Sequence, residues 1–169
     1  SAILRVIGGL VECCRLRLGD SLSEPMPLPT TLHVLAIDDN PADLQLLTVA
    51  FEALVARVDL RTARDGRDAV EQLQVELLRA AGWVPDLIMI DLNMPRIDGL
   101  ETIARLRGNR ALAKVPIAVL SGSMHPADQA HALAAGASWY VTKPANFAGL
   151  LNELGGLLAR LTVAGSSRR

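Results

Sequence analysis

The sequence predicts a doubly wound α/β domain, (βα)5, with a sheet of five parallel strands, and three observations carry this prediction. Short apolar runs alternate with segments of helical periodicity, as repeated βα units require. The runs are almost continuously apolar, which is typical of parallel strands covered by helices on both faces. The chain has 169 residues, 50% of them hydrophobic and 21% charged, which suits one domain with a packed core.

The five strands are expected at apolar runs of three to six residues. The second run is the weakest of the five. In chain order they are Leu32–Ile37, Val58–Ala63, Leu87–Ile90, Val115–Leu120 and Trp139–Val141.

Each run is followed by a segment with helix signals. Asn40-Pro41 provides an N-cap and a proline at the first helical position, and Asp65-Gly66 opens the second helix. A short third helix contains Leu100 to Leu106, and the fourth extends from Pro126 to Ala135 and ends at Gly136. The fifth has leucines at helical spacing from Phe147 to Leu161, with Asn146 as its cap.

Residues 1–30 are expected to lie outside this domain. Three prolines within five positions, Pro25, Pro27 and Pro29, interrupt regular structure and mark the boundary. The extension is a tag remnant, an over-long gene start with Met26 as the initiator, or an added helix for self-association or a partner. The domain itself is expected over residues 31–162, followed by a frayed tail at 163–169.

Composition and charge exclude several classes of function. The formal net charge is −1 and aromatic residues make up 3%, which argues against a nucleic-acid partner. The longest stretch without a charged residue, Gln129 to Thr142, is too short and too polar to span a membrane. The adjacent Cys13 and Cys14 do not suit a disulfide scaffold or a zinc site, and this favours a cytoplasmic location.

Candidate functional residues follow the ends of the strands. Asp38-Asp39, Asp91, Ser121 and Lys143 come directly after, or near, the ends of four apolar runs. In open α/β sheets the functional site lies at the carboxyl ends of the strands. In the order 2-1-3-4-5, strands one and three are neighbours, and this arrangement brings the three carboxylates together.

Three adjacent carboxylates repel one another, and a cation must relieve that repulsion. Carboxylate and carbonyl oxygens suit Mg²⁺, which completes its coordination shell with water and phosphate oxygens. Lys143 adds a compact positive charge, and Ser121 adds a hydroxyl donor. Carboxylates, a metal ion, a lysine and a serine together suit phosphoryl transfer to a side chain.

These motifs carry a family resemblance. From about Thr31 to Thr162 the chain resembles a receiver domain of the two-component response regulators. The matching segments are Ile37–Asn40, Leu87–Pro95 with Asp98-Gly99, Val119–Gly122, Gly136-Ala137 and Tyr140–Pro144. The resemblance implies a flavodoxin-like fold and a phosphoacceptor that promotes its own phosphorylation and dephosphorylation without being an enzyme for another substrate.

The resemblance also implies a role for each site residue. Asp91 is the expected phosphoacceptor. Asp38, Asp39, Asp91 and the backbone carbonyl of Asn93 are expected to hold Mg²⁺, Asp38 mostly through water. Ser121 and Lys143 are expected to contact the phosphoryl group, and Tyr140 to turn inward. The Lys143-Pro144 bond is expected to be cis, and Asn93 and Ser123 to tune the lifetime of the acyl phosphate.

The resemblance further implies partners and a switching surface. A sensor histidine kinase or a phosphotransfer protein would supply the phosphoryl group in a two-component system or phosphorelay. The surface formed by Pro126–Ala135, Trp139–Val141 and Phe147–Leu161 would then change and engage a downstream protein partner. A stand-alone regulator is expected, because little sequence follows the last helix. A weaker similarity to phytochrome-associated response regulators suggests a homodimer through the last two helices.

The sequence leaves two alternatives open. A degenerate receiver would act only as an interaction module, and failure to bind Mg²⁺ would support that reading. A haloacid-dehalogenase-type phosphatase also uses a strand-end aspartate, Mg²⁺, a Ser or Thr and a lysine. That class normally has an aspartate two residues after its nucleophile, where this sequence has Asn93.

Overall fold

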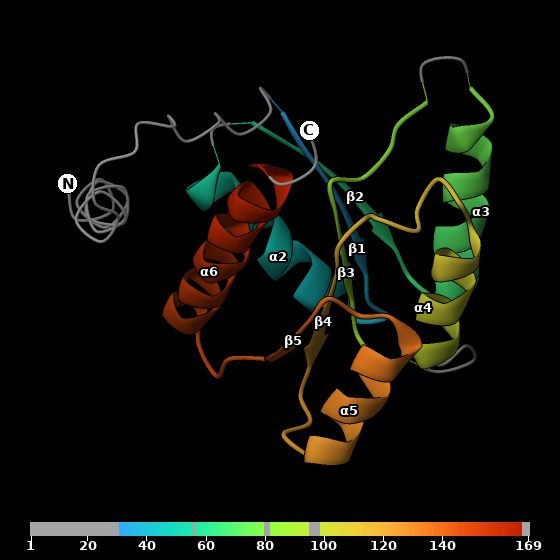
Figure 1. Cartoon of the computed structure of the whole chain (residues 1–169). Coiled ribbons are helices and arrows are strands. Elements are labelled where there is room, and N and C mark those ends of the chain that lie inside the picture. The colour runs from blue at the N-terminus through green and yellow to red at the C-terminus, as the bar shows by residue number, and fades with distance from the viewer. Residues whose placement is uncertain (1–30, 56, 80–81, 95–98, 167–169) are drawn as a thin grey trace, which may run out of the picture.

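The strands form one parallel sheet at the centre of the domain (Figure 1). The computed structural model describes residues 31–55, 57–79, 82–94 and 99–166. The five strands lie in the order β2-β1-β3-β4-β5, which confirms the predicted doubly wound, flavodoxin-like topology. Their bounds are β1 Leu32–Ile37, β2 Val58–Ala63, β3 Leu87–Ile90, β4 Ile117–Ser121 and β5 Trp139–Thr142.

Five helices pack on the sheet in two layers. They are α2 Pro41–Leu54, α3 Gly66–Leu77, α4 Gly99–Gly108, α5 Pro126–Ala135 and α6 Phe147–Ser166. In Figure 1, α2 and α6 cover one face of the sheet, and α3, α4 and α5 cover the other. The last helix, α6, continues to Ser166, beyond residue 162, where the sequence placed the end of the domain.

The central strands contribute buried side chains to both faces. On β1, Val34 and Ala36 face the α2 and α6 layer, whereas Leu35 and Ile37 face the α3, α4 and α5 layer. The same alternation continues on β3, where Met89 joins the first cluster and Ile88 the second. Both faces are apolar, so these strands appear in the sequence as continuous runs rather than as alternating patterns.

Local signals set the helix ends. The side chain of Asn40 accepts a 3.0 Å hydrogen bond from the backbone N–H of Ala42, and Pro41 is the first residue of α2. Asp65 caps α3 through the N–H of Asp68 at 2.8 Å, and Asn146 caps α6 through the N–H of Gly149 at 2.8 Å. Gly136 ends α5 in the left-handed region, with φ of 111°.

Two further expectations concern the N-terminal extension and membrane-spanning segments. The N-terminal extension, residues 1–30, lies outside the described residues. Within the described segments, none of the helices has both the length and the apolar character needed to cross a membrane.

Candidate functional site

Parallel strand pairing delivers the candidate residues to one edge of the sheet. Asp38 and Asp91 follow the paired strands β1 and β3, and the N–H of Asp91 donates a 2.9 Å hydrogen bond to the carbonyl of Ile37. Ser121 ends β4, and its carbonyl accepts a 2.7 Å hydrogen bond from the N–H of Lys143. The sheet backbone itself therefore brings these residues close together.

The Lys143 ammonium lies at the centre of this cluster. Its Nζ is 2.8 Å from Oδ2 of Asp38 and 3.1 Å from Oδ2 of Asp91. Both carboxylates are buried, while the Lys143 side chain keeps 23% of its surface exposed. A strand-end lysine predicted from sequence thus joins two strand-end aspartates more than fifty positions away.

Lys143 contacts a third carboxylate, that of Asp43, which the sequence did not predict as part of the site. Oδ2 of Asp43 lies 2.7 Å from Nζ of Lys143 and gives the shortest of the three ion pairs. Asp43 stands in the first turn of α2, where an acidic residue is commonly explained by the helix dipole alone. The sequence did contain one signal for this role: Asp43 follows Asp39 by only four residues, on a helix that starts at the site.

The donor atoms fit a hard divalent cation. One carboxylate oxygen from each of Asp38, Asp39 and Asp91 lies within 4.8 Å of the others. Asp39 is exposed while Asp38 and Asp91 are buried, so this cluster, called the carboxylate pocket below, is partly open to solvent. An all-oxygen, highly charged donor set of this kind suits Mg²⁺, which retains waters and binds phosphate oxygens.

Backbone hydrogen bonds orient two of these carboxylates in the same way. Oδ1 of Asp38 accepts from the N–H of Asn40 at 2.9 Å, and Oδ1 of Asp91 accepts from the N–H of Asn93 at 3.2 Å. In both cases the bond spans two residues, as in an Asx turn. The second oxygen of each carboxylate is thereby directed to Lys143.

The pKa values of Asp38 and Lys143 are both raised in this site. Burial raises the pKa of Asp38, and this outweighs the lowering by hydrogen bonds from Lys143 and the N–H of Asn40. Burial by itself lowers the pKa of Lys143, but its hydrogen bonds to Asp38 and Asp43 outweigh that effect and the net pKa is raised. Lys143 is therefore held as the ammonium, and one ammonium is shared among several carboxylates.

Ser121 connects the carboxylate pocket to the loop that follows β4. Its side chain is fully buried, and its Oγ accepts a 3.2 Å hydrogen bond from the N–H of Ser123. The side-chain amide of the exposed Asn93 lies 3.5 Å from the same Oγ. The hydroxyl of Ser123 in turn hydrogen-bonds Oδ2 of Asp128 in the first turn of α5.

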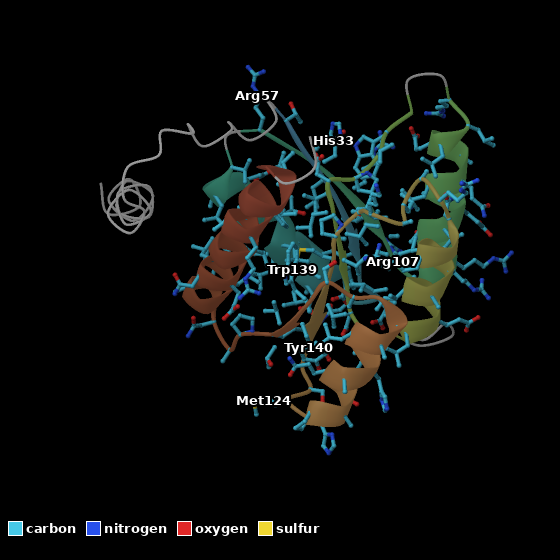
Figure 2. The ribbon with its side chains drawn as sticks, viewed as in Figure 1. His33, Arg57, Arg107, Met124, Trp139 and Tyr140 are labelled. Atoms are coloured by element: carbon cyan, nitrogen blue, oxygen red, sulfur yellow. The ribbon has the colours of Figure 1, made fainter. Side chains whose placement is uncertain are left out.

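Tyr140 lies beside this loop rather than in the carboxylate pocket. Figure 2 shows Tyr140 and Met124 at the end of the sheet near α5, and His33 and Arg57 at the opposite end. The partly buried Tyr140 packs against the apolar cluster on the α3, α4 and α5 face. Its hydroxyl donates a 2.8 Å hydrogen bond to the carbonyl of Ser123.

The expected cis bond before Pro144 is wrong for this structure. Among the described residues every peptide bond is trans, including the bond from Lys143 to Pro144. An X–Pro bond prefers trans by only about 0.5–1 kcal/mol, so the surrounding fold selects the isomer and the dipeptide does not. With the trans bond, Lys143 still contacts all three carboxylates.

The fold and the site together define a class of protein. A doubly wound sheet in the order 2-1-3-4-5, with an aspartate cluster and a lysine at its carboxyl edge, is the architecture of a flavodoxin-like signalling domain. The chain belongs to the response regulator receiver domain family, which matches residues 34–155. The expectation drawn from the sequence motifs is thus confirmed at the level of the family.

Relatives of known sequence cover the same segment. The DNA-binding dual master transcriptional regulator RpaA of Synechocystis sp. is 34% identical over 128 residues, 76% of this chain and 49% of that protein. Protein PilG of Pseudomonas aeruginosa is 34% identical over 67% of this chain and 77% of its own length. The chain therefore spans about half the length of RpaA and a larger share of PilG.

Solved structures agree with the fold. The phosphorylated cyanobacterial phytochrome response regulator RcpA superposes with a TM-score of 0.68 and 32% identity, covering 75% of this chain and 91% of that one. The Mn²⁺-bound form of response regulator Rcp1 gives a TM-score of 0.65 and 28% identity over 75% and 91% of the two chains. Phytochrome-associated regulators are thus among the similar structures, as the sequence suggested.

Membership of this family sets the general level of function. Receiver domains serve as phosphoacceptors in two-component signalling and interact with histidine kinases or phosphotransfer proteins. They are generally not catalytic enzymes, and they bind Mg²⁺ at an acidic pocket. In this chain, Asp38, Asp39 and Asp91 form a cluster of acidic side chains at the corresponding edge of the sheet.

Proposed function

We propose that this protein accepts a phosphoryl group on Asp91 from a partner histidine kinase or phosphotransfer protein, in a reaction that depends on Mg²⁺. The observation that carries the proposal is the 3.1 Å contact between the Lys143 ammonium and Oδ2 of Asp91. That contact occurs beside the carboxylates of Asp38 and Asp39, which complete an all-oxygen cluster.

The chemistry follows from the positions of these groups. A carboxylate oxygen of Asp91 attacks the phosphorus of a phosphohistidine, the P–N bond breaks, and the imidazole of the donor leaves with the bonding electron pair. The product is an acyl phosphate on Asp91. We propose that Lys143, whose Nζ is 3.1 Å from Oδ2 of Asp91, and the hydroxyl of Ser121 contact its phosphoryl oxygens. Most of the acceleration would then come from positioning and charge neutralisation.

Asp38, Asp39 and Asp91, with the backbone carbonyl of Asn93, would hold the metal ion. Bound there, Mg²⁺ would neutralise the charge on the phosphoryl oxygens during transfer. The buried Asp38 and Asp91 then need less compensation from Lys143, so the ammonium becomes free to contact the phosphoryl group. Asn93 and Ser123 both contact Oγ of Ser121, and we propose that they set the lifetime of the acyl phosphate.

Phosphorylation is proposed to switch the surface formed by α5, β5 and α6. The phosphoryl group adds negative charge and acceptor oxygens beside Ser121, and any conformation that satisfies them is favoured. The loop after β4 links Ser121 to Tyr140 and to α5 through Ser123. We propose that a downstream protein partner, or a second copy of the chain, binds the altered surface in the cytoplasm.

Labelling with acetyl phosphate tests the phosphoacceptor. The unmodified protein should gain one phosphoryl group in the presence of Mg²⁺ and none with EDTA, as followed by intact mass. Asp91→Asn should abolish the labelling, and Asp68→Asn, a carboxylate that has no contact with Lys143, should leave it intact. Labelling of Asp91→Asn at the unmodified rate would overturn the assignment.

The same experiment separates the alternatives. Stable stoichiometric phosphorylation distinguishes a phosphoacceptor from a haloacid-dehalogenase-type phosphatase, which turns over a phosphate ester. Failure to bind Mg²⁺ would indicate a degenerate receiver. For the switch, beryllofluoride with Mg²⁺ should shift the amide resonances of Ser121, Tyr140 and α5, while those of α3 should shift least.

A further inference from the structure

The Lys143 ammonium has three N–H donors, and each is directed at a different carboxylate. The acceptors are Oδ2 of Asp38 at 2.8 Å, of Asp43 at 2.7 Å and of Asp91 at 3.1 Å. An ammonium has no further proton to donate. Any change at one of these contacts therefore alters the other two.

Asp43 differs from its two partners in position. The Asp43 side chain is 33% exposed, whereas those of Asp38 and Asp91 are 4% and 9% exposed. Asp43 comes from the first turn of α2, and Asp38 and Asp91 come from strand ends. The candidate cation cluster found among the described residues consists of Asp38, Asp39 and Asp91, and it does not include Asp43. It therefore pulls on the ammonium from the solvent side of the pocket.

We propose that Asp43 is a positioning residue that holds the Lys143 ammonium partly away from Asp38 and Asp91 and thereby keeps those carboxylates available to a divalent cation. This inference rests on the proposed function, because it concerns the same acidic pocket. Asp43 would thereby determine how strongly Lys143 competes with the metal ion for Asp38 and Asp91.

Competition between the two cations gives the direction of the effect. Oδ2 of Asp38 and Oδ2 of Asp91 are both occupied by Lys143, and Asp38 and Asp91 also belong to the cation cluster. Without the charge of Asp43, the ammonium settles more fully on these two carboxylates. A divalent cation must then displace a lysine that binds these carboxylates more strongly, so the affinity of the pocket for the cation falls.

Mg²⁺ titration by calorimetry, without any phosphoryl donor, tests the proposal. Asp43→Asn keeps the shape of the side chain and removes its charge, and it should weaken Mg²⁺ binding at least about threefold. Asp68→Asn is the matched control, because Asp68 is the third residue of α3 as Asp43 is of α2. The control makes the same charge change without a contact to Lys143 and should leave the affinity unchanged.

A double-mutant cycle separates action through Lys143 from simple attraction between charges. Lys143→Met removes the competing ammonium and should strengthen Mg²⁺ binding. In that background, Asp43→Asn should change the affinity much less than it does in the unmodified protein. An equal or larger effect would show that Asp43 acts on the cation by its own charge, and the proposal would be overturned.

The outcomes also distinguish this inference from the proposed function. If the unmodified protein binds Mg²⁺ and is phosphorylated, but Asp43→Asn behaves as Asp68→Asn does, only the role of Asp43 fails. If the unmodified protein does not bind Mg²⁺, the proposed function itself fails. Thermal unfolding of each variant confirms that the affinities are compared between folded proteins.

Discussion

The hydroxyl of Tyr140 donates a 2.8 Å hydrogen bond to the backbone carbonyl of Ser123, and the N–H of Ser123 lies 3.2 Å from Oγ of Ser121. Tyr140 on β5 is therefore connected to the end of β4 through a single residue of the intervening loop. This arrangement ties the surface near α5 to the carboxylate pocket without placing Tyr140 in the pocket.

Tyr140→Phe should loosen this loop and leave the cation site intact. The ring remains in its apolar surroundings, and only the hydrogen bond to Ser123 is lost, at a cost of about 1 kcal/mol in the free energy of unfolding. Urea unfolding would measure that loss, and Mg²⁺ titration should give an unchanged affinity. A change of Mg²⁺ affinity by tenfold would mean that Tyr140 supports the carboxylates directly.

Asp38→Asn should stabilise the Mg²⁺-free protein at neutral pH. Burial raises the pKa of Asp38, so its favourable contribution to folding is present below the unfolded pKa of about 4 and is lost as pH rises through the folded pKa. The neutral asparagine avoids that loss. In EDTA the variant should melt about 3 °C higher at pH 7, with little difference at pH 3.5. A stability gain that is larger at pH 3.5 would contradict the sign.

Gly136→Ala should destabilise the domain. Gly136 has a φ of 111°, and an added Cβ would lie 2.8 Å from Cγ of Arg107. Backbone strain at positive φ and this close contact together should cost about 2 kcal/mol in urea unfolding. Gly156→Ala is the matched control. It lies within α6 with open space around its Cβ, and it should instead raise stability by up to about 1 kcal/mol.

Arg107→Lys should also be costly, although it keeps the charge. The guanidinium binds three backbone carbonyls, through Nε to Gly136 at 2.8 Å and through one terminal nitrogen to Leu112 at 3.1 Å and Val115 at 2.7 Å. A lysine has a single nitrogen and cannot reproduce this fork. The free energy of unfolding should fall by about 2 kcal/mol. Stability equal to that of the unmodified protein would show that water replaces these contacts.

The secondary structure could be predicted well because its signals are local. Asn40, Asp65 and Asn146 cap helices through bonds that span two or three residues, and Gly136 ends α5 through its own backbone angle. The strands were visible because helices cover both faces of the sheet. The end of α6 was placed too early, since helix ends depend on weak, cooperative last turns.

The strand-end residues of the site were predictable for a related reason. The carboxyl ends of parallel strands meet at one edge, so Asp38, Asp91 and Lys143 had to lie near one another once the strand order was assigned. Asp43 was missed because the direction in which the first turn of α2 faces is set by the packing of that helix on the sheet, and the sequence does not show it. The trans bond before Pro144 was missed because its energy difference is small.

The sequence by itself determined the order of strands and helices, their caps, and the set of polar residues at the strand ends, because each depends on neighbours along the chain. Only the tertiary structure decided that one ammonium is shared by Asp38, Asp43 and Asp91, and that Tyr140 is joined to Ser123. Contacts between side chains distant in sequence depend on the packing of whole layers and on the exact reach of each side chain. Those quantities are fixed only when the sheet and its helices have assembled.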